Sequence, residues 1–300
     1  MRKRVVRDWL KTGRIIRPLV LVIASALPSL GLADMTSAIK HWIVYYGDGT
    51  AAAAESLKHF DLIVLDSDRH PPLTPLLERH RSVLGYLSIG EVNKTRSYFD
   101  ELRDEGLLLP ENPQWKGSYG VDVRNPRWTA RVLEKLVPNI LQQGFTGIFI
   151  DTIDRVIDQE RADPVRWRGM NEAMVRVVRA LRQHYPKMTI MVNRGYALWP
   201  ELLPLVDMVV AESLMTTYDF AATKYQDVDK QALERDLRML QLVREQYRSL
   251  PILTLDYWDP DDAAGIVRIY QAQRQRGFIP YVATIALDRI IAEPRSEAIK

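Results

Sequence analysis

The stretch GFTGIFIDTID, at residues 144–154, decides the fold. Its centre is a short apolar run, GIFID at 147–151, in which apolar and polar residues do not alternate. Such a run predicts a strand that is buried on both faces, as in a parallel sheet. The run ends in Asp151, so a carboxylate is expected at the C-terminal end of that strand.

Seven further runs of this kind occur along the chain, at residues 41–47, 61–67, 82–91, 189–195, 208–213, 251–257 and 280–285. Helical stretches lie between them, at residues 127–143, 170–184, 232–248 and 261–276. Eight strands alternating with helices over about 250 residues predict an α/β protein with a single (β/α)8 TIM barrel. A doubly wound sheet usually has about five or six strands, and no glycine-rich nucleotide-binding loop follows any of the runs.

Local signals predict where some of the helices begin and end. Asn125-Pro126 and Asp259-Pro260-Asp261 are expected helix starts, because proline fits the first turn and the polar side chain can cap it. Gly144 and Gly277 stand where helices are expected to end.

The first 33 residues are predicted to be a secretory signal peptide. Seven Lys and Arg residues precede residue 18, an apolar run follows at 19–27, and the segment ends in Gly31-Leu32-Ala33. This order is typical of an export signal cleaved after a small residue, here Ala33, and it predicts a secreted or periplasmic protein. The apolar run is shorter than the roughly 20 residues that span a bilayer. An uncleaved anchor and an amphipathic surface helix are the alternatives, and residues 34–300 are the predicted barrel domain.

The formal net charge of +3 comes from that segment. It holds seven of the 41 basic and one of the 38 acidic residues, so residues 34–300 carry 34 basic and 37 acidic residues and a net charge of −3. An acidic domain fits a cationic partner and argues against DNA, RNA or anionic lipid. No stable membrane insertion is expected after cleavage. The sequence has no cysteine, which excludes a disulfide scaffold, a thiolate metal site and a cysteine nucleophile.

Acidic side chains close or follow several of the apolar runs. This places them at the end of the predicted barrel where TIM-barrel sites form. Each alone could cap a helix or pair with an arginine. Together, like charges around one mouth are unfavourable unless they bind a cation, share protons or take part in chemistry. The six are Asp66, Glu91, Asp151, Asp154, Glu212 and Asp256.

Two kinds of chemistry use such a ring of carboxylates. A metal hydrolase needs clustered ligands, but no two of the five histidines have an i, i+4 spacing, so no metal or other cofactor is predicted. Glycoside hydrolysis needs two carboxyl groups that flank one bond. Asp151 and Glu212 close the fourth and sixth runs. Side chains on alternate strands can approach to about 5–6 Å, which suits a retaining double displacement.

Aromatic side chains favour a polysaccharide as the substrate. Flat rings offer apolar faces to pyranose rings, and neighbouring polar groups bind the hydroxyls. About half of these aromatics are expected to pack in the barrel instead, and residues 92–125 are the expected wall of a cleft. The aromatic residues in or just after the run ends are Tyr46, Tyr86, Trp115, Tyr119, Tyr196, Trp199, Tyr218, Tyr257 and Trp258.

In these stretches the sequence resembles glycoside hydrolase family 114, the endo-α-1,4-polygalactosaminidases, and is similar to the hydrolase domain of the Pel polysaccharide-modifying enzyme. The resemblance depends on the order and spacing of six stretches, which span nearly all of residues 41–260. They are YYGDG (45–49), GYLSIGEVN (85–93), YGVDVRNPRW (119–128), GFTGIFIDTID (144–154), VVAESL (209–214) and LTLDYWDP (253–260).

The resemblance implies a metal-free (β/α)8 hydrolase of an amino-sugar exopolysaccharide, with Asp151 and Glu212 as the catalytic pair. We assign Asp151 as the nucleophile and Glu212 as the general acid/base, although the two roles could be exchanged. The residues predicted to bind the sugar or to tune the pair are Tyr46, Asp66, Tyr86, Glu91, Asp154, Asn193, Arg194, Tyr218, Asp256 and Tyr257.

Two positions depart from the family pattern, and two other interpretations stay open. Arg194 stands where relatives carry a small or amide residue, so it could repel a cationic galactosamine or recognise a carboxylated or acetylated sugar. Thr146 replaces an acid that is common there. The chain could instead be a non-catalytic carbohydrate-binding barrel in polysaccharide export or biofilm assembly, or a deacetylase or other metal hydrolase. The leading interpretation is a secreted, endo-acting glycoside hydrolase of a galactosamine-rich exopolysaccharide.

Overall fold

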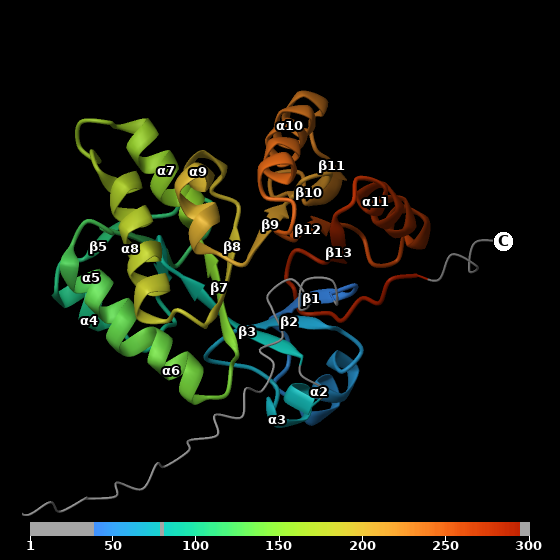
Figure 1. Cartoon of the computed structure of the whole chain (residues 1–300), viewed down its shortest axis with the longest axis horizontal. Helices are drawn as coiled ribbons and strands as arrows, with labels where there is room; N and C mark the ends of the chain where they lie inside the picture. The colour runs from blue at the N-terminus through green and yellow to red at the C-terminus, as the bar shows by residue number, and fades with distance from the viewer. Residues whose placement is uncertain (1–38, 79–80, 295–300) are drawn as a thin grey trace, which may run out of the picture.

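Eight parallel strands form the centre of the computed structural model, which describes residues 39–78 and 81–294 (Figure 1). The indole Nε1 of Trp42 on the first strand donates a 2.9 Å hydrogen bond to the carbonyl of Ile279 on the last, which joins the two ends of the sheet. The strands follow one another in the order β1 (Trp42–Tyr45), β2 (Leu62–Leu65), β3 (Ser82–Ser88), β7 (Gly147–Asp151), β8 (Thr189–Asn193), β9 (Met208–Glu212), β12 (Ile252–Tyr257) and β13 (Ile279–Ala283). The chain is therefore a nearly closed (β/α)8 TIM barrel, as predicted.

The short apolar runs become strands because both of their faces are covered. All four residues of β2 are fully buried, with 0% of their surface exposed. β7 has the predicted bounds, and the other strands lie within their predicted runs or start one residue earlier. The run at 82–91 is divided: β3 ends at Ser88, and the chain then enters a second, smaller sheet.

Helices cover the outside of the barrel (Figure 1). They are α2 (Ala51–Leu57), α3 (Thr74–Leu77), α4 (Phe99–Asp104), α5 (Pro126–Arg131), α6 (Val137–Gln142), α7 (Ile153–Ala162), α8 (Met170–His184), α9 (Trp199–Leu202), α10 (Lys230–Gln246) and α11 (Ala263–Gln275). The bounds of α8 match the prediction, and the side chain of Asn125 caps α5 by accepting from the N–H of Arg127 at 3.0 Å.

Two helix predictions needed correction. The expected helix 127–143 is interrupted by a π-helical turn, Val132–Leu136. Pro138 follows this turn and has no N–H to bond to the carbonyl of residue 134, which accounts for the irregular turn. The last helix begins later than Asp259-Pro260-Asp261: its cap is Asp262, whose Oδ1 accepts from the N–H of Gly265 at 2.9 Å.

Two excursions leave the C-terminal ends of barrel strands. After β3, the strands β4 (Glu91–Asn93), β5 (Leu108–Glu111) and β6 (Ser118–Val121) form an antiparallel sheet in the order β4-β6-β5. We call this first excursion, residues 91–121, the first arm. After β9, the strands β10 (Thr216–Asp219) and β11 (Lys224–Asp227) form a hairpin, which we call the second arm.

The predicted signal peptide, residues 1–33, lies outside the described residues. Among the helices of the described part of the chain, none is long and apolar enough to cross a membrane.

Candidate active site

Three neighbouring strands end in polar side chains that contact one another. Asp151, Asn193 and Glu212 are the last residues of β7, β8 and β9. Nδ2 of Asn193 donates to Oδ1 of Asp151 at 3.0 Å and also to Oε2 of Glu212. Two oxygens that accept from one nitrogen lie no more than about 6 Å apart. The structure thus brings together the two carboxylates that the sequence singles out as a pair.

Two tyrosines donate to the remaining oxygens of this pair. Oη of Tyr86, on β3, donates to Oδ2 of Asp151 at 2.9 Å, and Oη of Tyr257, on β12, donates to Oε1 of Glu212 at 2.5 Å. Tyr46 packs edge-on against Tyr86, with ring centroids 5.3 Å apart. Each of the four carboxylate oxygens therefore has a donor, and both carboxylates are held in fixed orientations.

The surroundings change the protonation behaviour of Glu212 and of the two tyrosines. Burial raises the pKa of Glu212, and the nearby charge of Asp151 raises it further, while the hydrogen bonds from Tyr257 and Asn193 partly oppose this. Burial also raises the pKa of Tyr86 and Tyr257 well above the ordinary value, and the carboxylates beside them add to the effect. Both phenols consequently keep their protons at neutral pH and act as donors. Of the pair, Glu212 has the environment of a proton donor.

The pair also differs from three of the four other predicted acids, because those three form ion pairs. Within residues 39–78 and 81–294, the side chains of Asp151 and Glu212 form no ion pair with Lys, Arg or His, whereas Asp66, Glu91 and Asp154 each form one with an arginine. Among these residues, the carboxylate of Asp151 therefore has no cationic partner of its own, whereas the charge of Arg194 acts on Glu212 and opposes part of the rise in its pKa.

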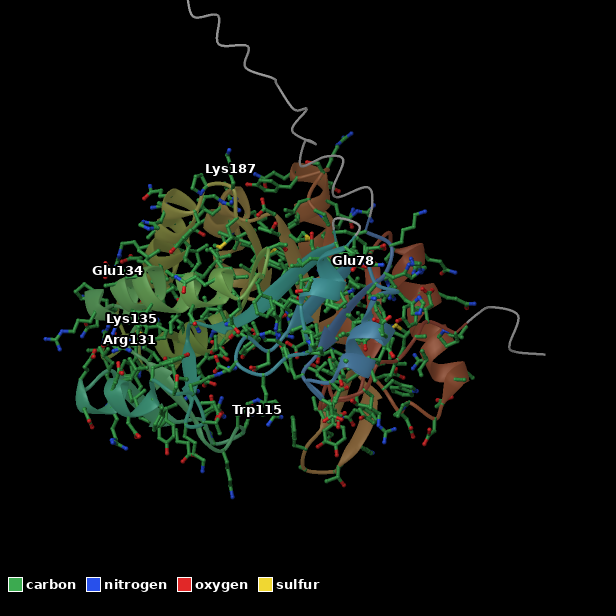
Figure 2. All side chains as sticks on the ribbon, turned by 90° about the horizontal axis from the view of Figure 1, so that it is seen from below. Glu78, Trp115, Arg131, Glu134, Lys135 and Lys187 are labelled. Atoms are coloured by element: carbon green, nitrogen blue, oxygen red, sulfur yellow. The ribbon has the colours of Figure 1, made fainter. Side chains whose placement is uncertain are left out.

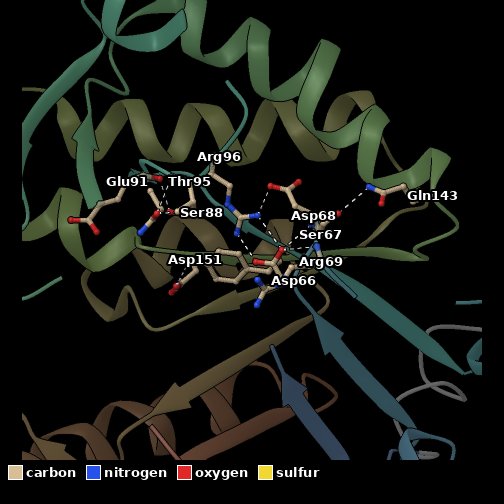
Figure 3. A network of polar contacts seen from close by, with 12 residues as sticks. Asp66, Ser67, Asp68, Arg69, Ser88, Glu91, Thr95, Arg96, Gln143 and Asp151 are labelled. Atoms are coloured by element: carbon tan, nitrogen blue, oxygen red, sulfur yellow. Dashed lines mark hydrogen bonds and ion pairs between the residues drawn. The ribbon is translucent and has the colours of Figure 1, made fainter. Parts of the chain in front are cut away.

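Asp66 and Asp154 are held by arginines. Arg96 binds Asp66 through Nη2 at 2.7 Å and Nη1 at 3.1 Å, and its Nη1 also reaches Asp68 at 2.6 Å (Figure 3). Burial alone would raise the pKa of Asp66, but the hydrogen bonds and charge of Arg96 lower it overall. Arg194 binds Asp154 through Nε at 2.6 Å. Both acids thus form ion pairs with arginines near the C-terminal ends of the strands.

Arg194, the departure from the family pattern, links two strand ends. Besides Asp154, its guanidinium donates from Nη1 to the main-chain carbonyl of Glu212 at 2.8 Å. It also lies over the ring of Tyr196, 5.5 Å from the ring centre. Asp154 balances the positive charge of Arg194, so this arginine contributes less repulsion to a cationic sugar than its presence in the sequence suggests.

Glu91 and Asp256 are buried and hold main-chain segments in place. Glu91 is 4% exposed and accepts from the side chains of Asn112 and Ser118, both at 2.9 Å. Asp256 is 0% exposed and accepts from the main-chain N–H of Met215 at 2.7 Å and of Thr216 at 2.9 Å. Among the described residues, neither acid hydrogen-bonds to the pair. Their hydrogen bonds hold the first arm together and connect the barrel to the second arm.

The predicted aromatic residues divide between the core and the rim. Trp199 is fully buried and donates from Nε1 to the carbonyl of Arg194 at 2.6 Å. Tyr218 lies in the second arm, where its ring is 5.0 Å from that of Tyr225. Trp115 is 49% exposed in the first arm. Only part of the predicted aromatic set is thus available to a ligand.

The residue directly after each of the three strand-end site residues has a left-handed backbone conformation, which the sequence did not predict. Thr152, Arg194 and Ser213 directly follow Asp151, Asn193 and Glu212, and their φ angles are 67°, 48° and 51°. Residues other than glycine rarely adopt this left-handed conformation, and such strain clusters at functional sites. No glycine signals these turns in the sequence, so only the structure could reveal them.

A cavity of about 300 Å³ adjoins Tyr86 and Arg96 and extends to Arg131 and Lys135, but the pair does not line it. Figure 2 shows Arg131 and Lys135 side by side at one flank of the molecule. The charge of Arg131 is already matched by Glu101 at 2.7 Å and Glu105 at 2.8 Å. The candidate active site is therefore defined by the two carboxylates that share the Asn193 amide, and not by this cavity. Among the described residues, no group of three or more His, Cys, Asp or Glu side chains is arranged to hold a metal ion.

A TIM barrel that holds two carboxylates about 6 Å or less apart at its strand ends is typical of glycoside hydrolases. The family model of glycoside-hydrolase family GH114 matches residues 32–298, and the chain belongs to this family. It is therefore a glycoside hydrolase, as the resemblance of its strand-end motifs implied.

Individual proteins are similar to this chain over most of their length. The glycoside hydrolase domain of PelA from Pseudomonas aeruginosa is 26% identical and superimposes with a TM-score of 0.74, covering 85% of this chain and 98% of that domain. Ega3 from Aspergillus fumigatus, solved in complex with galactosamine, shares the fold at a TM-score of 0.62 and 14% identity, covering 83% of this chain and 92% of Ega3. An uncharacterized protein of Deinococcus radiodurans is 28% identical over 274 residues, 85% of this chain and 83% of the relative.

Proposed function

We propose that this glycoside hydrolase cleaves a galactosamine-rich exopolysaccharide within the chain, by a retaining mechanism that uses Asp151 and Glu212. The observation that carries the proposal is the single Asn193 amide that binds both carboxylates. Carboxyl groups about 5–5.5 Å apart suit a retaining double displacement, whereas an inverting enzyme needs about 6.5–9.5 Å to admit a water. The carboxylate oxygens of Asp151 and Glu212 both accept from Nδ2 of Asn193, and this fits the shorter separation of a retaining enzyme.

In the first step, a carboxylate oxygen of Asp151 attacks the anomeric carbon of the sugar. The bond from that carbon to the glycosidic oxygen breaks, and Glu212 gives its proton to the departing oxygen. The raised pKa of Glu212 supports this assignment, because the group must be protonated at this stage. The donors Asn193 and Tyr86 stabilise Asp151 as an anion before the attack.

In the second step, the ionised Glu212 takes a proton from water, whose oxygen attacks the anomeric carbon. The bond to Asp151 breaks, and the sugar is released with the configuration of the bond that was cleaved. Glu212 regains its proton and Asp151 its charge, so the pair returns to its starting state.

A cationic amino sugar fits the charge of this site. Asp151 lacks a cationic side-chain partner among the described residues, so an ammonium group on the substrate would meet its negative charge. The relatives point the same way: Ega3 was solved with galactosamine, and the PelA domain is a glycoside hydrolase. We propose an α-1,4-linked, at least partly deacetylated galactosamine polymer. Export by the predicted signal peptide would bring the enzyme to such an exopolysaccharide outside the cytoplasm.

The test is incubation of the purified protein with defined oligomers of galactosamine and of N-acetylgalactosamine, with product lengths read by mass spectrometry. Internal cleavage of the galactosamine oligomers is expected, and Asp151→Asn and Glu212→Gln should abolish it. Asp158→Asn, at an acid on the exposed surface of α7, is the matched control and should keep full activity. Absence of cleavage of both oligomers would reject the proposed substrate. Full activity in both site variants would reject the proposed pair.

A further inference from the structure

Two exposed aromatic rings from distant parts of the sequence touch each other. Trp115 is 49% exposed and Phe220 is 51% exposed, and their ring centroids lie 5.0 Å apart at an interplanar angle of 78°. The other large hydrophobic side chains exposed within the described part of the chain are Val165 and Leu242. Large aromatic side chains left in water at a shared location are typical of a binding surface.

The two rings reach each other from opposite sides of the active-site strands. Trp115 lies in the turn between β5 and β6 of the first arm, and Phe220 directly follows β10 in the second arm. The first arm follows β3 and the second follows β9, and β7 and β8 lie between those two strands in the barrel. The contact therefore joins the two arms at the end of the barrel that carries Asp151, Asn193 and Glu212.

A buried acid fixes the first arm. Glu91 accepts from Nδ2 of Asn112 and Oγ of Ser118, both at 2.9 Å, and these two residues flank the turn that holds Trp115. Arg155 on α7 pairs with the same carboxylate at 2.9 Å. These contacts hold the base of the turn against the barrel, so the position of Trp115 is defined by the fold.

A second buried acid fixes the other arm. Asp256 accepts from the main-chain N–H of Met215 and of Thr216, at the start of β10, and from Nε2 of Gln273 at 2.7 Å. Toward the tip of the hairpin, the ring centroids of Tyr218 and Phe220 lie 5.2 Å apart, so Tyr218 supports the Phe220 ring from one side. Phe220 thus has a packed face and an exposed part, as expected for a residue that is held ready for a ligand.

We propose that Trp115 and Phe220 form a carbohydrate-binding platform, in which the Trp115 ring stacks on a pyranose ring of the polysaccharide and the nearly perpendicular Phe220 ring supports it, away from the bond that Asp151 and Glu212 cleave. Neither ring hydrogen-bonds to the pair, and both are half exposed at the mouth. The flat faces suit the C–H face of a sugar, and an indole also attracts the ammonium group of an amino sugar. The platform rests on the proposed function for its choice of ligand, and it deepens that function by defining a position for a neighbouring sugar unit.

Binding to an inactive enzyme tests the platform without any turnover. Long galactosamine oligomers are titrated into three proteins that all carry Glu212→Gln, and calorimetry gives the affinity of each. The three are the parent with Trp115, the Trp115→Leu variant and the Trp115→Phe variant. Trp115→Leu keeps an apolar contact but loses the flat ring, and is expected to weaken binding by about 3- to 10-fold. Trp115→Phe should recover part of the affinity. Leu242→Ala, at a hydrophobic residue that is 60% exposed on α10, is the control and should bind as tightly as the parent.

The length of the oligosaccharide substrate distinguishes a sugar-binding role of the two rings from a purely structural one. In the active enzyme, Trp115→Leu and Phe220→Leu should raise KM for long oligomers with little change in kcat, and should leave hydrolysis of the shortest cleaved oligomer unchanged. An equal loss on short and long oligomers, or unchanged binding of long oligomers, would overturn the platform. Faster cleavage of long chains by either variant would also overturn the platform, because the two aromatic rings would then hinder the polysaccharide instead of binding it. If the protein bound galactosamine oligomers through Trp115 but cleaved none, the platform would stand and the proposed function would fall.

Discussion

Asp151 and Glu212 accept hydrogen bonds from the same side-chain amide, that of Asn193. The two N–H groups of that amide point to different acceptors, one on each carboxylate. Asn193 therefore sets the distance between the two acids and keeps both in reach of one sugar. Because it ends β8, between β7 and β9, the order of strands in the barrel is what makes this bridge possible.

Removal of the bridging amide should reduce catalysis much more than substrate binding. In Asn193→Ala, both carboxylates lose a donor and the pair can move apart. We expect kcat to fall about 100-fold, by comparison with the loss of a preorganised donor in other enzymes, with a small change in KM. Steady-state kinetics on a galactosamine oligomer measure this. Asn139→Ala, at an exposed residue of α6, is the control. A loss confined to KM would mean that Asn193 binds the sugar and does not position the pair.

The hydroxyl of Tyr257 should set the alkaline limit of activity. Its hydrogen bond stabilises ionised Glu212 and lowers the pKa of that group, so Tyr257→Phe should raise it. The first step needs Glu212 protonated, and a higher pKa extends the protonated form to higher pH. The alkaline limb of the kcat/KM profile should therefore move to higher pH. Tyr247→Phe, at the C-terminal end of α10, should leave the profile in place. If the alkaline limb of Tyr257→Phe were unchanged or shifted to lower pH, the assignment of Glu212 as the general acid would be contradicted.

Ser213 should show the strain of the turn after Glu212. Its φ of 51° is left-handed, a conformation that glycine adopts at no steric cost. We expect Ser213→Gly to be about 1 kcal/mol more stable than Ser213→Ala, the size of the left-handed penalty for a residue with a Cβ atom. Urea unfolding of the two variants measures the difference. Equal stabilities would mean that the surroundings, and not the local backbone, determine this turn.

Glu91 should be important for folding rather than for the chemical step. Glu91→Ala leaves Arg155, Asn112 and Ser118 without their acceptor, and loss of one partner from a buried ion pair costs about 3–5 kcal/mol. The free energy of unfolding should fall by an amount near the lower end of that range, because Arg155 is partly exposed. Hydrolysis of the shortest cleaved oligomer should persist at temperatures where the variant is folded. A folded variant with normal stability and no activity would show instead that Glu91 acts on the substrate.

The barrel could be predicted from the sequence because its signal is local and repeated. Each short apolar run, such as 147–151, indicates a doubly buried strand, and the chain order of such runs is the order of strands in a barrel. Asp151 and Glu212 could be found in the same way, since TIM-barrel sites form at the C-terminal ends of the strands and both acids end such runs.

The parts that could not be predicted depend on contacts between distant segments. The sequence places acids at strand ends but does not show that Arg96 neutralises Asp66, or that Asp256 is buried under the second arm. It singles out Trp115 without its partner, because Phe220 lies in a hairpin that no apolar run announces. The left-handed residues Thr152, Arg194 and Ser213 are equally hidden, since their conformations are imposed by packing and not by glycine.

The most direct test of the central claim is the anomeric configuration of the first product. Proton NMR during cleavage of an α-linked galactosamine oligomer, recorded before mutarotation, distinguishes the α from the β anomer at the new reducing end. Double displacement by Asp151 and Glu212 predicts the α anomer, which retains the configuration of the cleaved bond. An initial β anomer would contradict it, because inversion requires a water between carboxylates that lie farther apart than one shared amide allows.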